Sequence, residues 1–218
     1  MSCDVGVVIP ALNEAATIAG VVAAAKQYGR VFVVDDGSTD STAVVAAANG
    51  AQVLRHETNQ GYDAALRSGL LAAAEAGRSL LVTLDADGQH DPNVIMRAVD
   101  PLRRGEASIA IGLRPEFVRL AERGFGWYTK RRFGVSDILC GVKAYRAADV
   151  LAHRRALGGT TIGTGLALVL LREGAKASTF PVAVRNRAGT SRFGVGLSAE
   201  FRIAAAMAHA VISDMRRD

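Results

Sequence analysis

The sequence is poor in cysteine and in aromatic residues. Its two cysteines, Cys3 and Cys140, form no CxxC pair, so they indicate neither a disulfide framework nor a zinc site, and we expect free thiols in a reducing compartment. Aromatic residues make up only 6% of the 218 residues, while half of the chain is hydrophobic. Alanine and valine must therefore fill much of a sizeable core.

Long apolar runs are also missing. No stretch of about 18 uncharged apolar residues occurs, which predicts that no helix spans a membrane. The N-terminus lacks the basic segment of a signal peptide, and the apolar run at 5–9 is too short for one. We therefore expect a cytoplasmic protein that contacts a membrane, if at all, peripherally at the cytoplasmic face.

Charge is the next constraint on the partners of the chain. The net charge is +5, and the basic residues gather in the C-terminal half, which suggests an anionic partner such as a phosphate or a membrane surface. No nucleic-acid-binding motif occurs, so nucleic acid is not an expected partner.

Short apolar runs alternate with Ala-rich segments over residues 1–113. The runs predict strands at 5–9, 31–34, 52–54, 80–84 and 108–113, and the segments predict helices at 15–28, from 38–40 to 49, at 62–76 and at 92–103. Pro10 is expected to end the first strand. This rhythm predicts an α/β fold with a mostly parallel central sheet flanked by helices. Ligands of such sheets bind beyond the carboxyl ends of the strands.

The regular alternation ends after residue 113. We expect a loop that enters a short strand at 137–146, helices at 147–153 and 162–172, a strand at 177–184, and a last helix at 197–215. No repeat or low-complexity linker separates the two parts. Residues 1–218 are therefore expected to form a single domain.

The sharpest chemical motif follows the expected strand at 80–84. Asp85 and Asp87 stand two residues apart, and Gln89 adds another oxygen in the same loop. Mg²⁺ and Mn²⁺ prefer oxygen ligands, and Mg²⁺ is commonly held by one or two carboxylates together with substrate phosphates. The motif predicts a site for a divalent cation; the alternative is a polar turn whose aspartate caps the next helix.

Two further loops follow expected strands. Asp35-Asp36-Gly37-Ser38 places carboxylates at a strand end, where one can accept hydrogen bonds from a nucleobase N–H or a ribose hydroxyl. The alternative is an ordinary turn with a capping serine. The loop from Pro10 to Glu14 can line a nucleotide pocket, although this signal is weak when taken alone.

Together and in this order, these segments resemble glycosyltransferase family 2 from Val5 to about Arg114, and Asn59-Gln60-Gly61 with Ala64-Ala65 and Gly69 is a fourth similar segment. Within the family, the chain is most similar to the polyprenyl-phosphate sugar synthases, the group of dolichyl-phosphate mannose synthase. That similarity is carried by Gly112-Leu113-Arg114, Asp137 with 140–144, and Gly189-Thr190-Ser191-Arg192.

The resemblance implies a GT-A (Rossmann-like) fold and a metal-dependent, inverting hexosyltransferase. The donor would be a UDP- or GDP-linked sugar, the cofactor Mg²⁺ or Mn²⁺, and the acceptor a polyprenyl phosphate of the dolichyl or undecaprenyl type. Residues 1–113 would then be the nucleotide-sugar-binding half, and residues 114–218 the acceptor-binding half with its C-terminal helix.

The resemblance also implies roles for individual residues. These are Pro10, Leu12 and Glu14 along the nucleotide; Val34 and Asp36 at the base and ribose; Asp85 and Ala86 at the ribose and sugar; Asp87 and Gln89 at the metal; and Arg114 with Arg185, Arg187 or Arg192 at the diphosphate or acceptor phosphate. Leu12 stands where the family often has an aromatic residue. Arg192 replaces a customary lysine, which exchanges a point charge for a planar fork.

The acceptor decides whether the reaction needs a base. A hydroxyl must lose a proton, whereas a phosphate is already anionic and needs positioning instead. Asp137 is the candidate for either task, with a capping or turn aspartate as the alternative. We expect Asp87, Arg114 and Asp137 to be the catalytic residues.

Two segments suit a membrane surface. Trp127-Tyr128-Thr129-Lys130-Arg131-Arg132-Phe133 combines interfacial aromatic residues with basic ones, and 199–217 is helical, apolar and basic. Both can instead pack on the body of the protein, and the second can also face a neighbouring subunit in a homodimer.

Other functions are expected less. Transfer to a small soluble or glycan hydroxyl acceptor uses the same chemistry. A sugar-phosphate nucleotidyltransferase would need a Gly-rich basic loop after the first strand, which is absent here; a non-catalytic nucleotide-sugar-binding protein would not need the loop at 85–89. His56, His153 and His209 show no metal-binding spacing, and His90 is expected to have a supporting role.

Overall fold

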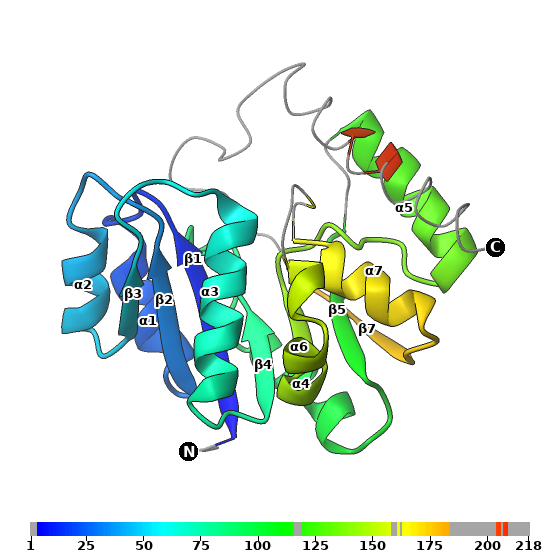
Figure 1. The fold of residues 1–218 in the computed structure, drawn as a ribbon, viewed down its shortest axis with the longest axis horizontal. Helices are drawn as coiled ribbons and strands as arrows, with labels where there is room; N and C mark the ends of the chain where they lie inside the picture. The colour runs from blue at the N-terminus through cyan, green and yellow to red at the C-terminus, as the bar shows by residue number, and fades with distance from the viewer. Residues whose placement is uncertain are drawn as a thin grey trace.

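The computed structural model describes residues 4–115, 119–157, 161 and 163–183, with residues 204, 205, 207 and 208 near the C-terminus. Within this part of the chain, seven strands form one sheet in the order β3-β2-β1-β4-β6-β5-β7 (Figure 1). The strands are β1 (Val5–Ala11), β2 (Arg30–Asp35), β3 (Gln52–Arg55), β4 (Leu80–Thr83), β5 (Ile109–Leu113), β6 (Lys143–Arg146) and β7 (Ala177–Pro181).

Helices connect most of the strands. They are α1 (Ile18–Ala25), α2 (Thr42–Ala48), α3 (Tyr62–Glu75), α4 (Val94–Arg103), α5 (Leu120–Phe133), α6 (Ala147–Ala152) and α7 (Gly165–Arg172), with a 3₁₀ turn η1 (Arg154–Leu157). All neighbouring strands run parallel except at β6, which is antiparallel to both β4 and β5. The predicted α/β class and mostly parallel sheet are confirmed.

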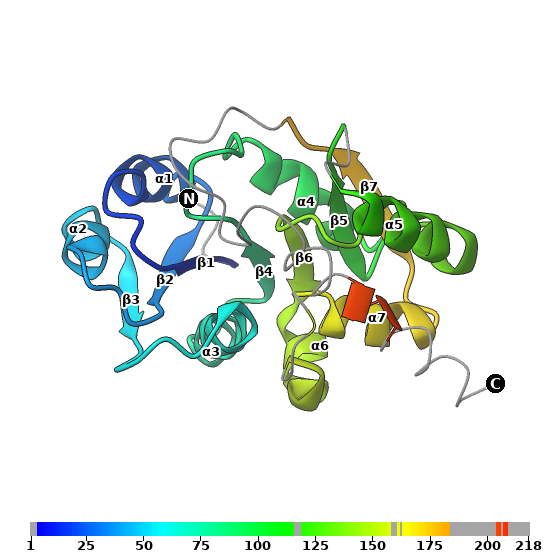
Figure 2. The ribbon, with the colours of Figure 1, turned by 90° about the horizontal axis from the view of Figure 1, so that it is seen from above.

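The core lies on both faces of the sheet because successive strand residues point to opposite sides. In β1, Val7 and Ile9 belong to the cluster beneath α1, α2 and α4, whereas Val8 belongs to the cluster beneath α3, α6 and α7. Seen from above, α1 and α4 lie on one side of the strands and α3, α6 and α7 on the other (Figure 2). The continuous apolar runs in the sequence reflect this double burial.

Two local predictions were wrong. Pro10 does not end the first strand: β1 runs on to Ala11, and Pro10 is paired with Val34. The pairing of β1 with β4 stops at Val8. At Pro10, strand β1 therefore has β2 as its one neighbouring strand, and the missing N–H of proline is tolerated there. Helix α2 begins only at Thr42, because the Ser38 side chain binds the loop after β1 instead of starting the helix. Asp40 bonds both segments: its Oδ2 accepts from Ala15 N at 3.1 Å, and its Oδ1 accepts from Thr42 N at 2.9 Å.

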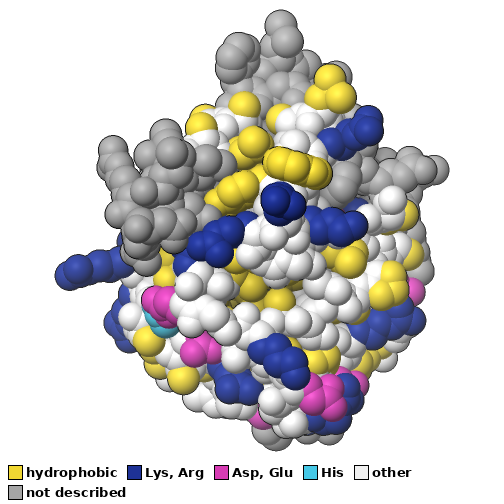
Figure 3. Space-filling view, turned by 90° about the vertical axis from the view of Figure 1, so that its right-hand side faces the viewer, with side chains coloured by type: hydrophobic (Ala, Val, Ile, Leu, Met, Phe, Trp, Pro, Cys, Tyr) yellow, Lys and Arg dark blue, Asp and Glu magenta, His cyan; other side chains and the backbone are white. Residues whose placement is uncertain are grey.

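The basic-aromatic segment forms helix α5, which is anchored by the fully buried Phe125. Leu120 and Trp127 are 77% and 70% exposed, and Lys130, Arg131 and Arg132 are exposed beside them. On the face of the molecule that includes α5, basic side chains alternate with hydrophobic ones (Figure 3). Among the described residues, no helix has the length and apolar character needed to cross a bilayer.

Helix α3 approaches the sheet closely at Gly69. A Cβ atom there would lie 2.4 Å from Val8 Cγ1 and 2.9 Å from Val34 Cγ2. Real Cβ contacts are not this short, so α3 would have to move away from β1 and β2 to admit one. The glycine therefore sets the distance between the helix and the sheet.

We predict opposite effects for alanine at two helical glycines. Gly69→Ala should lower the free energy of unfolding by about 1–3 kcal/mol through overpacking. Gly20→Ala should raise it by about 0.5–1 kcal/mol, because Gly20 lies exposed in α1 with nothing near its missing Cβ and alanine favours a helix. Urea unfolding measures both; equal effects of the two changes would contradict the close approach.

Candidate active site

Polar residues from three segments lie at the carboxyl edge of the sheet. Asp36 follows β2, His56 follows β3 and Asp85 comes two residues after the end of β4, and these strands run parallel with β1. The backbone N–H of Asp36 donates to Ala11 O at 2.9 Å, and that of His56 donates to Asp35 O at 2.9 Å. The edge predicted to bind ligands therefore holds the predicted carboxylates.

The loops after β1 and β2 are joined to each other. Asn13 N donates to Ser38 Oγ at 2.9 Å, and Thr39 N donates to Asn13 Oδ1 at 2.9 Å. Asn13 adopts φ 54°, a left-handed conformation that asparagine tolerates better than most residues. Glu14 N donates to Thr42 Oγ1 at 2.8 Å, so both loops form one hydrogen-bonded unit.

Asp36 is buried and receives three hydrogen bonds. Its Oδ1 lies 2.7 Å from His56 Nδ1 and accepts from Gln60 N at 2.9 Å, while its Oδ2 accepts from Gly61 N at 2.8 Å. Gly61 has φ 93°, which favours glycine and lets two successive N–H groups reach one carboxylate. Asp36 is thus fixed by the segment 56–61.

The loop after β4 carries the predicted metal ligands. Asp85 Oδ1 accepts from Tyr62 Oη at 3.2 Å, and its Oδ2 lies 3.5 Å from His90 Nε2. Asp87 is buried and its Oδ1 accepts from Gln89 N at 3.0 Å. Residues 60–62 therefore connect the Asp36 and Asp85 carboxylates.

These residues fit an oxygen-seeking divalent cation that is shared with a ligand. Among the described residues, no three His, Cys, Asp or Glu side chains are arranged to hold a metal by themselves. Two carboxylates and the Gln89 amide in one loop match the partial oxygen set that Mg²⁺ uses when phosphates complete its coordination. The neighbouring His90 Nδ1 is buried and finds no hydrogen-bond partner in the described part of the chain.

Arg114 and Asp137 form a bidentate ion pair. Arg114 Nε donates to Asp137 Oδ2 at 2.8 Å, a terminal guanidinium nitrogen donates to Oδ1 at 2.8 Å, and the Arg114 backbone N–H donates to Oδ2 at 3.0 Å. Asp137 is 1% exposed and the Arg114 side chain 21%. Burial lowers the pKa of Arg114, but the hydrogen bonds and the charge of Asp137 outweigh this effect and raise that pKa above its usual range.

Lys143 links this pair to residues 85–89, the predicted metal loop. Its ammonium group is buried, donates to Cys140 O at 2.6 Å, and is attracted by both Asp137 and Asp85. Burial is the largest influence and lowers the Lys143 pKa; it also raises the pKa of the Cys140 thiol to about 12. Cys140 is a buried free thiol, as predicted, whereas Cys3 lies outside the described residues.

Gly141 brings the loop before β6 against Asp85. A Cβ at Gly141 would lie 2.1 Å from Asp85 Oδ2, so only glycine fits there without moving the carboxylate. Thr83 Oγ1 donates to Gly141 O at 2.6 Å and accepts from Lys143 N at 3.1 Å. The 137–143 loop is therefore attached directly to β4 and to the metal loop.

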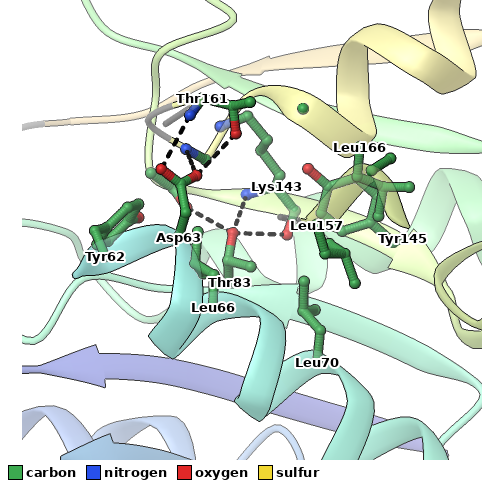
Figure 4. Close-up of a pocket in the computed structure, with 14 residues that line it drawn as sticks. Tyr62, Asp63, Leu66, Leu70, Thr83, Lys143, Tyr145, Leu157, Thr161 and Leu166 are labelled. Carbon is green, nitrogen blue, oxygen red and sulfur yellow. Dashed lines mark hydrogen bonds between the residues drawn. The ribbon is translucent and has the colours of Figure 1, made fainter. Parts of the chain in front are cut away.

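A small cavity adjoins this junction (Figure 4). One part of it is lined by Tyr62, Thr83, Gly141 and Lys143. Leucines from α3, η1 and α7 line much of the remainder. Asp63 closes one wall by accepting hydrogen bonds from Thr161 N at 3.1 Å and Gly163 N at 2.7 Å. The cavity thus lies between α3 and the segment before α7, and two of its lining residues, Tyr62 and Gly141, also lie against Asp85.

The other predicted site residues vary in their placement. The side chains of Val34 and Ala86 are completely buried, so either residue could meet a ligand only through its backbone. Glu14 is also buried, and its carboxylate accepts from Thr17 Oγ1 at 3.1 Å. The predicted phosphate ligands of the last loop, Arg185, Arg187 and Arg192, lie outside the described residues. Most of the expected C-terminal helix also lies outside them.

Sequence reasoning missed His56, Tyr62 and Lys143. His56 was set aside because its spacing suits no metal, yet it directly follows β3, and the rule that selected Asp36 at the end of β2 also selects it. Tyr62 and Lys143 reach the site through contacts between distant segments, which no local pattern reveals.

Comparison with known proteins identifies the family. The family model for glycosyl transferase family 2 matches residues 6–140, and the chain belongs to this family. The described fold is that of GT-A glycosyltransferases: glucosyl-3-phosphoglycerate synthase from Mycobacterium tuberculosis, crystallised with Mn²⁺, UDP and glucosyl-3-phosphoglycerate, superimposes with a TM-score of 0.76 at 23% identity, over 97% of this chain and 80% of that one.

Two relatives with named activities are more similar in sequence. Polyprenol monophosphomannose synthase from Mycolicibacterium smegmatis is 33% identical over 163 residues, covering 64% of this chain and 60% of the relative. Undecaprenyl-phosphate mannosyltransferase from Micrococcus luteus is 30% identical over 165 residues, covering 66% and 67%. The chain spans 64% of the length of further relatives from Methanocaldococcus jannaschii and Mycobacterium bovis.

The buried pair makes a clear prediction for stability. Asp137→Asn should lower the free energy of unfolding by about 3–5 kcal/mol, because it removes the buried charge that binds the Arg114 fork and leaves only Glu122 Oε1, 3.9 Å away, to balance the guanidinium. Asp100→Asn breaks the exposed pair with Arg103 and should cost less than about 1 kcal/mol. Denaturant unfolding compares the two variants, and similar small losses would show that the Arg114–Asp137 pair does not hold the loop.

Proposed function

We propose that this chain is a hexosyltransferase that moves a sugar from a nucleoside diphosphate sugar to a polyprenyl phosphate with inversion. The observation that carries the proposal is the position of Asp85, Asp87 and Gln89. They lie at the carboxyl edge of the sheet, within the segment matched by the family model. That edge is where open α/β sheets bind nucleotides.

The donor would lie across the joined loops. Asp36 supplies an oriented carboxylate for a base N–H or a ribose hydroxyl, and the loop from Pro10 to Glu14 lies beside it through the Asn13–Ser38 contact. Asp85, held by Tyr62, would face the ribose and sugar. The M. tuberculosis complex with UDP supports a nucleotide in this fold.

Asp87 and Gln89 would hold the cation, Mg²⁺ or Mn²⁺. When bound, the cation acts as a Lewis acid that stabilises the charge developing on the leaving diphosphate. The protein's own contribution is orientation: the bond from Gln89 N fixes the Asp87 carboxylate, and Gly141 leaves room for the neighbouring Asp85 carboxylate. Fixed groups of this kind need no reorganisation during reaction.

The state of Asp137 favours a phosphate acceptor. A base must accept a proton, but both Asp137 oxygens accept hydrogen bonds from the Arg114 fork, so protonation of Asp137 would disrupt that pair. Such a pair is a better scaffold than a base, and an anionic phosphate needs no deprotonation. We propose that Asp137 and Arg114 position the acceptor loop, and that an arginine at 185, 187 or 192 contributes charge at the phosphates.

The two mannosyltransferase relatives support the lipid-phosphate acceptor by their names. The exposed Trp127 and the basic residues of α5 would suit peripheral contact with an anionic membrane surface. A small phosphorylated acceptor such as phosphoglyceric acid is the second candidate, because the M. tuberculosis enzyme crystallised with it shares this fold over 96% of the chain.

Removal of the metal-loop carboxylate tests the donor half. Titration of the wild type with UDP and with GDP should show binding of one nucleotide that strengthens with Mn²⁺ and weakens with a chelator. Asp87→Ala should lose the Mn²⁺ effect and reduce transfer by roughly a hundredfold or more while keeping its unfolding transition. The exposed Asp100→Asn serves as control; normal turnover of Asp87→Ala with Mn²⁺ would refute the assignment.

Matched acceptors test the second half. With the donor fixed, the chain should glycosylate a detergent-dispersed polyprenyl phosphate and should not glycosylate the corresponding polyprenol, which lacks the anionic group. Product formed on 3-phosphoglycerate alone would establish the soluble-acceptor alternative. Nucleotide binding without transfer to any of these acceptors would indicate a binding protein.

A further inference from the structure

His56 connects the nucleotide-binding carboxylate to helix α3. Its Nδ1 lies 2.7 Å from Asp36 Oδ1, and its Nε2 lies 2.9 Å from Ser68 Oγ. The imidazole is 11% exposed, so it is held between these two partners rather than by solvent. Ser68 precedes Gly69, the point at which α3 lies closest to the sheet.

The partners determine the direction of these bonds. A carboxylate only accepts, so the proton of a neutral His56 lies on Nδ1 and donates to Asp36. Nε2 is then an acceptor, and the Ser68 hydroxyl donates to it. The result is a chain of donors that starts on α3 and ends on the carboxylate at the sheet edge.

This chain leaves Asp36 with a defined capacity. Each carboxylate oxygen offers about two acceptor positions. Oδ1 is filled by His56 and Gln60 N, whereas Oδ2 receives Gly61 N and, among the described residues, keeps one position. Because the bond to His56 fixes the rotation of the carboxylate, it also fixes the direction in which Oδ2 can accept from a ligand.

The order Asp–His–Ser resembles an acyl-transfer relay, in which the serine attacks a substrate. Here the end of the Asp–His–Ser chain that faces the ligand site is the carboxylate and not the serine. The carboxylate lies at the edge where ligands bind, and the serine lies on a helix packed against the sheet. The arrangement therefore serves the carboxylate.

We propose that His56 is a positioning residue for nucleotide binding, which orients Asp36 toward the nucleoside of the donor with support from Ser68. The inference rests on the proposed function, in which Asp36 contacts the base or ribose. Residues that support a ligand-binding group in this way commonly change affinity by about tenfold to a hundredfold when they are lost.

Calorimetric titration with UDP and GDP in excess Mn²⁺ tests this role. His56→Leu should weaken binding of the preferred nucleotide about tenfold to a hundredfold, because hydrogen bonds to charged groups are strong. His56→Asn, whose amide can still donate to Asp36, should recover part of that loss. Ser68→Ala should weaken binding by a smaller factor, about twofold to fivefold.

Two comparisons separate positioning from a merely structural effect. In an Asp36→Asn background, His56→Leu should cause little further loss, because the two residues act as one unit. The matched control is His153→Leu, which removes a histidine bonded to Asp149 O and Glu173, and nucleotide affinity should not change. Thermal unfolding of each variant reports its fold.

Three results would overturn the inference. Wild-type affinity in folded His56→Leu would overturn it while leaving the proposed function intact. Equal losses in His56→Leu and His56→Asn that follow their losses of thermal stability would reduce His56 to a structural residue. Failure of the wild type to bind either nucleotide would overturn both this inference and the proposed function.

Discussion

Buried carboxylates at the carboxyl edge of the sheet are the constraint on which the rest of the site depends. Asp35, Asp36, Asp87 and Asp137 are all buried, and an ionised carboxylate taken out of water is costly unless donors replace its hydration. The chain supplies these donors from its turns and from distant side chains, such as Gly61 N and Arg114. Asp36, Asp87 and Asp137 thereby fix the loops that donate to them, whereas Asp35 Oδ2 has only the charge of Arg55, 3.3 Å away. The polar network thus defines loop positions that apolar packing alone would not.

This network also explains how the site can be oriented before a ligand arrives. Asp36 is held by three donors from one segment, and that same segment continues through Tyr62 to Asp85. The loops after β1 and β2 are joined through Asn13. Movement of one carboxylate would therefore disturb several hydrogen bonds at once, and groups arranged in this way stabilise charge without reorganising.

The sequence predicted the fold where a local pattern determines it, and failed where distant contacts do. Continuous apolar runs located the parallel strands because both faces of the sheet are covered, as Val7 and Val8 show. Asp36 and Asp87 could be selected because they follow such runs. The antiparallel placement of β6 and the pairing of Arg114 with Asp137 depend on contacts across 23 or more residues. His56 is a third case. Its position after β3 could be predicted from the sequence, but its role at the site was missed because its spacing suits no metal.

The strands before and after Arg114 belong to one sheet, and this connects Asp85 to the ion pair of Arg114 with Asp137. Strand β6 lies between β4 and β5. The loop before β6 carries Asp137, and its end is bonded to Thr83 of β4. Gly141 is in contact with Asp85, and the buried Lys143 is attracted to both Asp85 and Asp137. The Lys143 ammonium donates to Cys140 O in the loop that carries Asp137, and a positive charge there favours the ionised form of nearby carboxylates. Under the proposed function, Asp85 on the donor side and the Arg114–Asp137 pair on the acceptor side would therefore be coupled, and a change that shifts the 137–143 loop would affect both.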